Sequence, residues 1–475
     1  MSLLENVEVK KIVRYADPEV EHIAFDSRKD CEKSLFVCLR GEKADGHDFA
    51  LDAERNGALA LVVEKEIVGS ALPQFVVRDA RKAFAIICGN FFGNPARKLK
   101  LVTVVGTNGK TSTTEILCRI FNEAGRLSAT IGTLGYMIGA ERSEGILTTP
   151  DPLELHEKLA EMVSKGVEYV FLEASAHAIY YSKLAGIKAC LSIFTNITQD
   201  HLDFFETMER YAEVKLSYFH PENTAIAVVN SDDEYGRRLI LKSNVPTISY
   251  GLYNPADVFA INVTEGQNGL SFTLNAYDLI ADITTPLCGK FNVYNVMAAT
   301  TAAMYLGVEL STIAKALKKM APVPGRFVSC DIKGRRVIVD YAHTPDGLEN
   351  LLSSVKKEAT GRVITVFGCG GDRDKSKRPI MGQIASHYSD YVIVTDDNPR
   401  FEKEEEIADQ ICKGIAADSL SEVILDRTEA IMRAFSLAQT GDTVVIAGKG
   451  HENTMEINGK KYPYSDLAIL EKLGR

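Results

Sequence analysis

The segment VVGTNGKTSTTEIL, from Val104 to Leu117, decides the fold of the chain around it. The apolar run LKLVTVV leads into a glycine-rich turn, and a helical segment from Thr111 to Ala124 follows. Gly106 and Gly109 allow backbone N–H groups to approach phosphate oxygens. Lys110 can neutralise phosphate charge, and Thr111 can ligate Mg²⁺ at the positive end of the helix. The segment therefore predicts a phosphate-binding loop.

The loop departs from the common G-x-x-x-x-G-K-[ST] pattern. That pattern would place the first glycine at Val104, but the first glycine here is Gly106, so the loop is two residues shorter. A glycine-rich turn with an incidental lysine is the alternative interpretation. The preceding strand, the following helix and the G-K-T order favour a nucleotide site.

The bulk composition fits a globular protein of several domains. The 475 residues are 45% hydrophobic and 25% charged, and this length suits about three domains. A net charge of −10 argues against non-specific nucleic-acid binding. The nine cysteines show no C-x-x-C pair and no zinc spacing, which favours a cytoplasmic setting. We find no signal peptide and no apolar run near the ~20 residues of a membrane span, and we expect a monomer.

Three regions differ in their patterns, and the predicted fold class is α/β. Residues 1–98 carry short β-like runs separated by helical stretches. In 99–327, continuous apolar strands alternate with helices, which predicts a central domain of mostly parallel sheet. In 328–475, five strands alternate with helices, including 404–415 and 428–439, as in a Rossmann-like domain. The polar clusters CGGDRDKSKR, DDNPR and GKGHE each follow a strand, where ligands bind in such sheets.

Three residues downstream of the loop suggest metal-assisted phosphoryl transfer. Glu173 ends one strand, His201 follows another, and Lys215 lies on a helix. Carboxylate and imidazole groups at neighbouring strand ends can surround Mg²⁺. Each residue also has a simpler interpretation, as a helix cap, a loop histidine and a solvated lysine respectively.

The order of motifs resembles that of the Mur ligases. GTNGKTS, LTTPDP, EASAHAI, FTNITQDHLDF, YAEVK, GKFNVYNVMAA, PVPGRF, VDYAHTPDGLENLL, DDNPR and GKGHE occur in sequence, and AFDSRK and ADGHDF extend the resemblance to the N-terminal region. The pattern is most similar to the branch that adds the third residue of the peptidoglycan stem peptide. The short G-T-N-G-K-[ST] loop is the form this family uses. The resemblance implies a three-domain architecture with a central P-loop ATPase domain.

The resemblance also implies chemistry and residue roles. ATP phosphorylates a carboxylate of the UDP-linked substrate, and an amine then attacks the acyl phosphate. Lys110, Glu173, His201 and Lys215 match catalytic positions; Thr111, Glu173, His201 and Lys215, the last as a carbamate, match positions that hold Mg²⁺. The positions implied to bind ATP are Gly106, Thr107, Asn108, Gly109, Lys110, Thr111, Ser112, Asn292, Asn295, Arg326 and Asp340.

Two further groups of residues match substrate positions. Those implied to contact UDP-N-acetylmuramoyl-L-Ala-D-Glu are Ser27, Thr148, Thr149, Ser175 and Lys183. The chain departs from the common pattern at Ala176, Tyr181, Lys183, Phe205 and Glu206. The DNPR form is associated with meso-diaminopimelate, whose extra carboxylate two arginines can clamp. The positions implied for that amino acid are Arg373, Asp397, Asn398, Pro399, Arg400, Gly448 and Glu452.

Two alternatives remain. The first is another amide ligase, such as an L-lysine-adding or other paralogous Mur ligase or a folylpolyglutamate synthase, with the same acyl-phosphate chemistry. FDSR and DNPR argue against it. The second is a non-catalytic nucleotide-dependent binding protein, and it would be expected to have lost one of the four catalytic positions.

Overall fold

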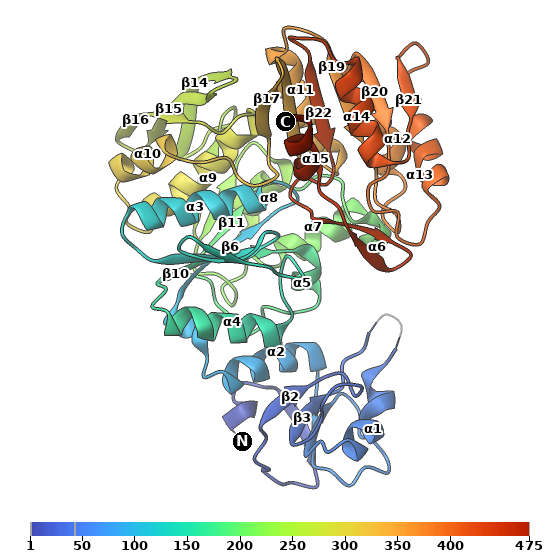
Figure 1. Cartoon of the computed structure of the whole chain (residues 1–475). Helices are drawn as coiled ribbons and strands as arrows, with labels where there is room; N and C mark the ends of the chain where they lie inside the picture. The colour runs from blue at the N-terminus through green and yellow to red at the C-terminus, as the bar shows by residue number, and fades with distance from the viewer. Residues whose placement is uncertain (1, 42–43, 475) are drawn as a thin grey trace. The chain divides into compact units, whose positions relative to one another are not determined.

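The computed structural model describes residues 2–41 and 44–474. Residues 1, 42 and 43, in the first predicted domain, and 475, in the third, lie outside the described residues. The chain forms two compact units: Met1–Thr103, Arg126–Leu191 and Tyr218–Ala225 make the first, and Val104–Gly125, Ser192–Ser217 and Ile226–Arg475 the second. Figure 1 gives the labels used below.

The first unit begins with a sheet of strand order β1-β5-β4-β3-β2. Its strands pair in parallel except β1, which is antiparallel to β5. Strand β4, ALVV, is buried throughout because apolar clusters cover both faces of this sheet. Its elements are η1 (Ser2–Leu4), β1 (Val9–Val13), β2 (His22–Ala24), β3 (Ser34–Val37), η2 (Gly46–Phe49), α1 (Ala50–Arg55), β4 (Ala60–Val63), β5 (Gln74–Val77), α2 (Ala80–Phe91) and η3 (Pro95–Lys98).

The same unit contains a second group of strands. Strand β10 is parallel to β7, whereas β7 and β8, and β8 and β9, are antiparallel. The predicted helix with Leu155, Leu159 and Met162 on one face is α4, and these three side chains are buried. The elements are β7 (Ser128–Gly132), β8 (Gly135–Ile138), β9 (Glu141–Ser143), α4 (Pro152–Ser164), β10 (Tyr169–Ala174) and α5 (Ala176–Tyr180).

The second unit begins where β6 (Lys100–Val105) runs into the phosphate loop, and α3 (Lys110–Glu123) follows. Strands β11 to β14 pair in parallel, as predicted, but β14, β15 and β16 form an antiparallel meander that the sequence analysis did not predict. The remaining elements are β11 (Leu191–Phe194), α6 (Leu202–Phe205), α7 (Met208–Leu216), β12 (Ala227–Asn230), α8 (Glu234–Lys242), β13 (Thr247–Gly251), β14 (Val258–Gly266), β15 (Gly269–Ala276), β16 (Leu279–Thr285), α9 (Phe291–Tyr305) and α10 (Leu310–Lys318).

The C-terminal part of the second unit is the expected Rossmann-like alternation. Its sheet has the order β17-β18-β22-β19-β20-β21, and only β17 is antiparallel to its neighbour. Its elements are β17 (Val328–Ile332), β18 (Arg335–Asp340), α11 (Pro345–Glu358), β19 (Val363–Phe367), α12 (Lys377–Tyr388), β20 (Tyr391–Val394), α13 (Glu404–Cys412), β21 (Ser421–Val423), α14 (Arg427–Leu437), β22 (Thr443–Ala447), β23 (Thr454–Ile457), β24 (Lys460–Pro463) and α15 (Asp466–Gly474). Helix α13 ends three residues before the predicted Ile415.

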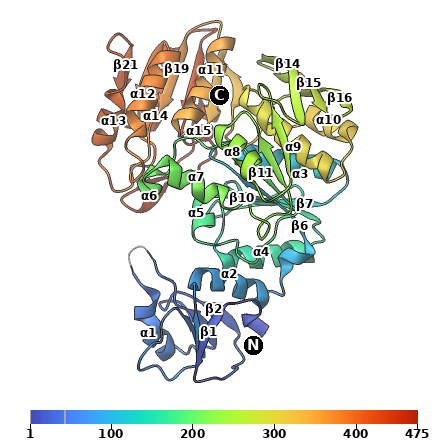
Figure 2. The ribbon, with the colours of Figure 1, turned by 180° about the vertical axis from the view of Figure 1, so that it is seen from behind.

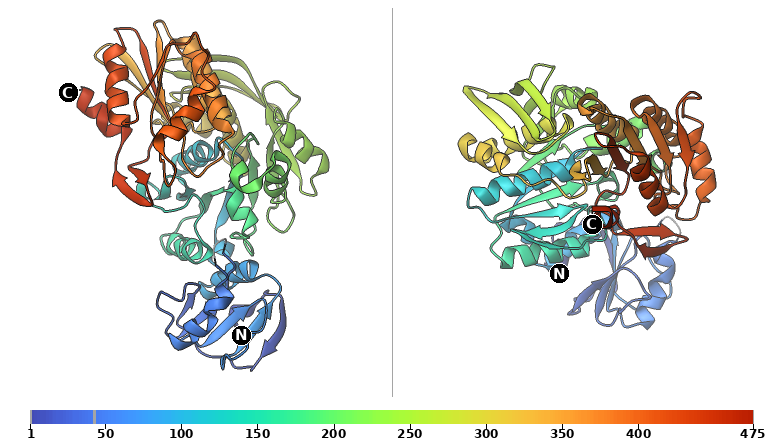
Figure 3. Two further views of the ribbon diagram at one scale, coloured as in Figure 1. Left: turned by 90° about the vertical axis from the view of Figure 1, so that its right-hand side faces the viewer. Right: turned by 45° about the horizontal axis from the view of Figure 1, so that its top comes forward.

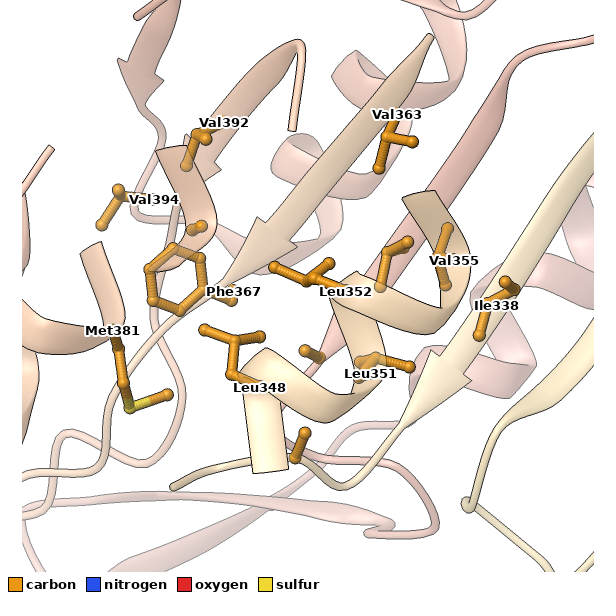
Figure 4. Packing of buried hydrophobic residues seen from close by; sticks show 14 of the residues in the cluster. Ile338, Leu348, Leu351, Leu352, Val355, Val363, Phe367, Met381, Val392 and Val394 are labelled. Carbon is orange, nitrogen blue, oxygen red and sulfur yellow. The ribbon is translucent and has the colours of Figure 1, made fainter. Parts of the chain in front are cut away.

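Helices cover both faces of this sheet, so its strands β19 and β22 are buried throughout. On one face, α11, α12 and α13 bury a cluster in which Leu348 and Leu352 lie beside Phe367 and Met381 (Figures 2 and 4). Helices α14 and α15 cover the other face. The antiparallel β23–β24 hairpin leaves the sheet as a separate ribbon (Figure 3). Among the described residues, no helix combines the length and apolar character needed to cross a membrane.

Candidate functional site

The phosphate loop is built around two glycines that tolerate no side chain. A Cβ on Gly106 would overlap Thr195 Oγ1, and one on Gly109 would overlap Asn295 Oδ1. Gly109 also has a φ of +86°, in the region that favours glycine. It is the N-cap of α3 and makes no side-chain cap, so the helix start presents its N–H groups and positive dipole end to a ligand.

Lys110 lies over this loop. Its Nζ donates to the carbonyls of Gly106 and Thr107, both at 2.8 Å. The next residue, Thr111, accepts at Oγ1 from Arg326 Nη2 at 3.1 Å, and Ser112 is buried in the first turn of α3. The structure therefore brings Arg326, from 215 residues later, to the start of the helix.

Asn108 is held by groups that are distant in the sequence. Its N–H donates to Asn196 Oδ1 at 2.9 Å, and its Nδ2 donates to Asp346 Oδ2 at 2.6 Å. Asp346 was not predicted as a site residue, although it lies in the VDYAHTPDGLENLL motif, three residues after His343. Burial raises the pKa of Asp346, and the bond from Asn108 opposes that rise.

The other predicted ATP-side residues form buried polar contacts. Asn292 and Asn295 lie one turn apart on α9, and Asn295 Nδ2 donates to Asn292 Oδ1 at 2.8 Å. Asp340 accepts the backbone N–H groups of Phe327 and Ala342, both at 2.7 Å. Burial raises the pKa of Asp340, while the Arg326 cation acts against the rise.

Lys215 is buried, with only 1% of the residue exposed, so its interpretation as a solvated helix lysine is wrong. Its Nζ donates to Thr107 Oγ1 at 3.3 Å and lies 4.4 Å from the centre of the Tyr211 ring. Burial, followed by repulsion from Lys110, lowers the pKa of Lys215 well below its ordinary value. A neutral amine is favoured at this position, and the neutral form is the nucleophilic one.

His201 caps the start of α6 in a left-handed conformation, with a φ of +56°. Its Nε2 lies 3.3 Å from Asp200 Oδ2, and Lys377 Nζ lies 3.8 Å from Asp200 Oδ1. Burial alone would raise the pKa of Asp200, but His201, Lys377 and His343 lower it, so this carboxylate is ionised. The position combines an imidazole with a fixed negative charge.

The described residues contain no group of three or more His, Cys, Asp or Glu side chains able to hold a metal alone. Mg²⁺ prefers few protein ligands together with substrate phosphates and water. Thr111, beside a helix start that suits phosphate, and His201 fit that type of site in the second unit.

Glu173, at the end of β10, belongs to the first unit. Its two oxygens accept from Thr133, at 2.9 Å from the N–H and 3.0 Å from Oγ1. The interpretation of Glu173 as a helix cap is wrong, because Ser175 caps α5 through a bond from the Ala178 N–H.

Four of the predicted UDP-substrate residues, Thr148, Thr149, Ser175 and Lys183, lie in or beside this network. Thr149 Oγ1 donates to the Glu173 carbonyl at 2.7 Å and lies 3.1 Å from Ser175 Oγ. Thr148 Oγ1 lies 3.2 Å from Thr133 Oγ1. Lys183 pairs with Asp151 at 2.7 Å.

Two further positions have local partners of their own. Ser27 uses its carbonyl to accept from Asn56 Nδ2 at 3.0 Å. Tyr181, one of the departures noted above, carries the guanidinium of Arg81 4.1 Å above its ring.

In the second unit, loops that follow β20 and β22 meet through a buried lysine. Lys449 Nζ donates to Asn398 Oδ1 at 3.0 Å and to Glu452 Oε2 at 2.8 Å, and Asn398 Nδ2 donates to the same Glu452 oxygen at 3.0 Å. Gly448 has a φ of +117°, and a Cβ there would approach Asp397 Oδ2 to 2.6 Å. Lys449 lies in GKGHE but was not predicted as a site residue.

A buried ion pair supports the loops that follow β20 and β22. Arg427 and Asp466 are fully buried and 2.9 Å apart. Arg427 also donates to the carbonyls of Asp396 and Ala447, at 3.2 and 2.9 Å. One guanidinium thus fixes the ends of two strands that precede predicted binding loops.

The loop after β19 completes this region. Arg400 Nη1 donates to the Gly371 carbonyl at 2.7 Å, and Gly371 also packs against the carbonyl of Pro399. Arg373 is exposed, and its Nη1 donates to the Asp372 carbonyl at 3.0 Å. The structure therefore brings DNPR, GKGHE and GGDRD together, as predicted for strand ends of one sheet.

Comparisons with known proteins agree with this architecture. Family models match in three segments: "Mur ligase family, catalytic domain" over residues 19–86, "Mur ligase middle domain" over 104–303, and "Mur ligase, glutamate ligase domain" over 325–450. The architecture thus comprises an N-terminal, a central and a C-terminal domain.

Two full-length relatives share a name. The UDP-N-acetylmuramoyl-L-alanyl-D-glutamate--2,6-diaminopimelate ligase of Syntrophomonas wolfei is 39% identical over 482 residues, covering 100% of this chain and 99% of that protein. Its namesake in Bacillus cereus is 41% identical over 464 residues, covering 96% and 94%. A solved structure of a ligase of the same name, 32% identical, aligns with a TM-score of 0.70 over 100% of this chain and 98% of that chain.

Proposed function

The chain belongs to the Mur ligase family of ATP-dependent ligases, and from this premise we propose that it joins meso-diaminopimelate to UDP-N-acetylmuramoyl-L-alanyl-D-glutamate in peptidoglycan synthesis. The observation that carries the choice of amino acid is the charge pattern of the C-terminal loops. Asp397 and Glu452 lie beside the buried cation Lys449, whereas Arg400, at the end of DNPR, bonds to the neighbouring loop that carries Arg373. The distal centre of meso-diaminopimelate carries both an ammonium and a carboxylate. The acidic side chains suit the ammonium, and the two arginines suit the carboxylate.

The chemistry follows from the weakness of a carboxylate as an electrophile. ATP transfers its terminal phosphoryl group to the substrate carboxylate, and the amine of the third amino acid attacks the acyl phosphate and displaces phosphate. The phosphoryl transfer depends on positioning and charge neutralisation. Bound Mg²⁺ supplies further neutralisation of the phosphate charge.

We assign the phosphates of ATP to the loop Gly106–Ser112. The backbone N–H groups at the start of α3 bind them, and Lys110 exchanges its two carbonyl partners for phosphate oxygens. Asn292, Asn295, Arg326 and Asp340 form the remaining nucleotide contacts. The direct bond between Arg326 and Thr111 supports this assignment.

Thr111, Glu173, His201 and a carbamylated Lys215 are the proposed Mg²⁺ ligands. A protonated lysine would repel the metal, whereas a carbamate supplies anionic oxygens. The burial of Lys215 beside Thr107 and Lys110 supports the modification, because both features favour the unprotonated amine.

We propose the domain boundaries 1–98, 99–327 and 328–475, with the UDP-linked substrate bound by the first domain and the adjoining part of the second. Ser27, Thr148, Thr149, Ser175 and Lys183 are its proposed contacts. Hydrogen bonds join Thr149, Ser175 and Glu173. They support a shared site for Thr148, Thr149, Ser175 and Lys183. We further propose a cytoplasmic monomer; the nine cysteines, all within the described residues, form no disulfide.

The direct test supplies meso-diaminopimelate and L-lysine separately, with the UDP-linked dipeptide, ATP and Mg²⁺. A site built for a charged group rejects an analogue that lacks it, so we expect kcat/KM to favour diaminopimelate by roughly 10³-fold. ADP release must depend on both substrates. Equal use of the two amino acids would overturn the assignment of DNPR and leave the ligase chemistry standing.

A further inference from the structure

The β23–β24 hairpin is attached to the DNPR turn by its backbone. The Arg400 N–H donates to the Glu456 carbonyl at 3.0 Å, and the Asn458 N–H donates to the Arg400 carbonyl at 2.6 Å. The Glu456 N–H donates to Asn398 Oδ1 at 2.9 Å. Arg400 has a φ of +54°, which is unfavourable for a side chain of its size, and these bonds hold it in that conformation.

The side chain of Glu456 then engages the guanidinium of Arg400. Glu456 Oε2 lies 3.3 Å from Arg400 Nε, while Arg400 Nη1 is bound to the Gly371 carbonyl. The two side chains remain 31% and 20% exposed, so water reaches the pair. Arg400 is therefore already paired with a carboxylate, and that pair is accessible enough to exchange.

We propose that Glu456 is a specificity-determining residue: it acts as an internal carboxylate ligand of Arg400, and the distal carboxylate of the third amino acid binds by replacing it. This inference rests on the proposed function. Because diaminopimelate must displace Glu456 from Arg400, its apparent affinity is lower than it would be without Glu456. Lysine has no distal carboxylate, so Glu456 stays on Arg400 and spares lysine the cost of leaving that cation unpaired. Glu456 thus reduces the preference of the enzyme for diaminopimelate over lysine.

The test measures KM for meso-diaminopimelate in the full-length Glu456→Gln enzyme at saturating ATP and UDP-linked dipeptide. Removal of a partly exposed carboxylate partner should lower this KM about 2- to 5-fold. The expected kcat and KM for ATP stay near the wild-type values, and the rate with L-lysine does not rise. A purely structural role would instead raise KM or lower kcat.

Glu422→Gln is the matched control, because Glu422 pairs with Arg433 at 2.9 Å on the same domain and is also partly exposed. It should leave both KM values unchanged. Glu456→Ala repeats the test without a side-chain amide. An unchanged or higher KM for diaminopimelate in both Glu456 variants overturns the inference alone. A wild-type enzyme that does not use diaminopimelate overturns the proposed function, and this inference with it.

Discussion

The second unit contains two proposed binding regions that are built in different ways. We call the phosphate loop Gly106–Ser112 and its surroundings the nucleotide half, and the loops with DNPR and GKGHE the amino-acid half. At Gly106–Ser112, one continuous segment provides glycines, a lysine and a helix start, and the contacts proposed for phosphate are mostly backbone N–H groups. At the amino-acid half, DNPR and GKGHE come from different strands and are held in place by buried charges. A phosphate is recognised by local geometry, whereas a specific amino acid requires side chains whose positions depend on distant partners.

Because the two halves are built from different residues, mutations in each half should affect different properties of the enzyme. Variants of the nucleotide half should reduce the reaction equally with either amino acid. Variants of the amino-acid half should change the ratio between diaminopimelate and lysine and leave ATP binding in place.

The largest effect is expected for Lys215→Ala, which removes the proposed metal-bridging carbamate. We expect kcat to fall roughly 10³-fold, with the same ratio between the two amino acids. Acetate should restore part of the activity, and mass spectrometry under non-acidic conditions should show the added carboxylate on the wild-type lysine. Lys165→Ala, at an exposed lysine, is the control. Full activity of Lys215→Ala would remove the bridging role.

Lys110→Ala should lower kcat about 10²-fold, because it removes charge stabilisation from the transferring phosphoryl group. Steady-state rates with both amino acids measure the loss, and the ratio between them should not change. Near-normal turnover would show that ATP binds elsewhere, and a changed ratio would break the separation of the two halves.

Arg400→Ala should lower kcat/KM for diaminopimelate about 10- to 100-fold, the range for losing a charged hydrogen-bond partner. The KM for ATP should stay near the wild-type value, and the preference over lysine should shrink. A rise in the KM for ATP as large as that for diaminopimelate would contradict the assignment.

The smallest effect concerns pH. Hydrogen bonds from Arg378 lower the pKa of Glu402 from 4.5 to about 2, and this pair holds the GGDRD loop through the Asp372 N–H. A depressed carboxyl pKa stabilises the fold fully above pH 4.5, and this stabilisation is lost as the pH falls towards 2. Urea midpoints should therefore depend less on pH over this range in Glu402→Gln than in wild type. Glu406→Gln, at an exposed pair, should behave as wild type.

The strand, loop and helix around Gly106–Ser112 could be predicted from the sequence because their determinants are adjacent along the chain. The strand, the two glycines and the helix start lie within Val104–Leu117, and the structure has them in that order. The same holds for the C-terminal alternation of strands and helices, since each element has its own periodicity.

The residues that the sequence analysis missed act through distant partners. Asp346 is 238 residues from Asn108, and Glu456 is 58 residues from Asn398. Lys449 looked like part of a glycine-rich turn, because nothing in its local pattern shows that it is fully buried between Asn398 and Glu452. The β14–β16 meander was missed for a related reason: strand β14 exposes Phe259 and Ile261, so its apolar pattern does not indicate a buried strand.

The ion pair between Arg427 and Asp466 also determines which parts of the chain can fold first during translation. Until Asp466 leaves the ribosome, Arg427 lacks the carboxylate that it hydrogen-bonds, and its burial behind the two loops is less favourable. Asp346, which completes the contact with the phosphate loop, is translated 120 residues earlier. At ordinary translation speeds that interval is on the order of ten seconds. A nascent chain can therefore assemble the proposed nucleotide-binding loop while the proposed amino-acid pocket is still incomplete.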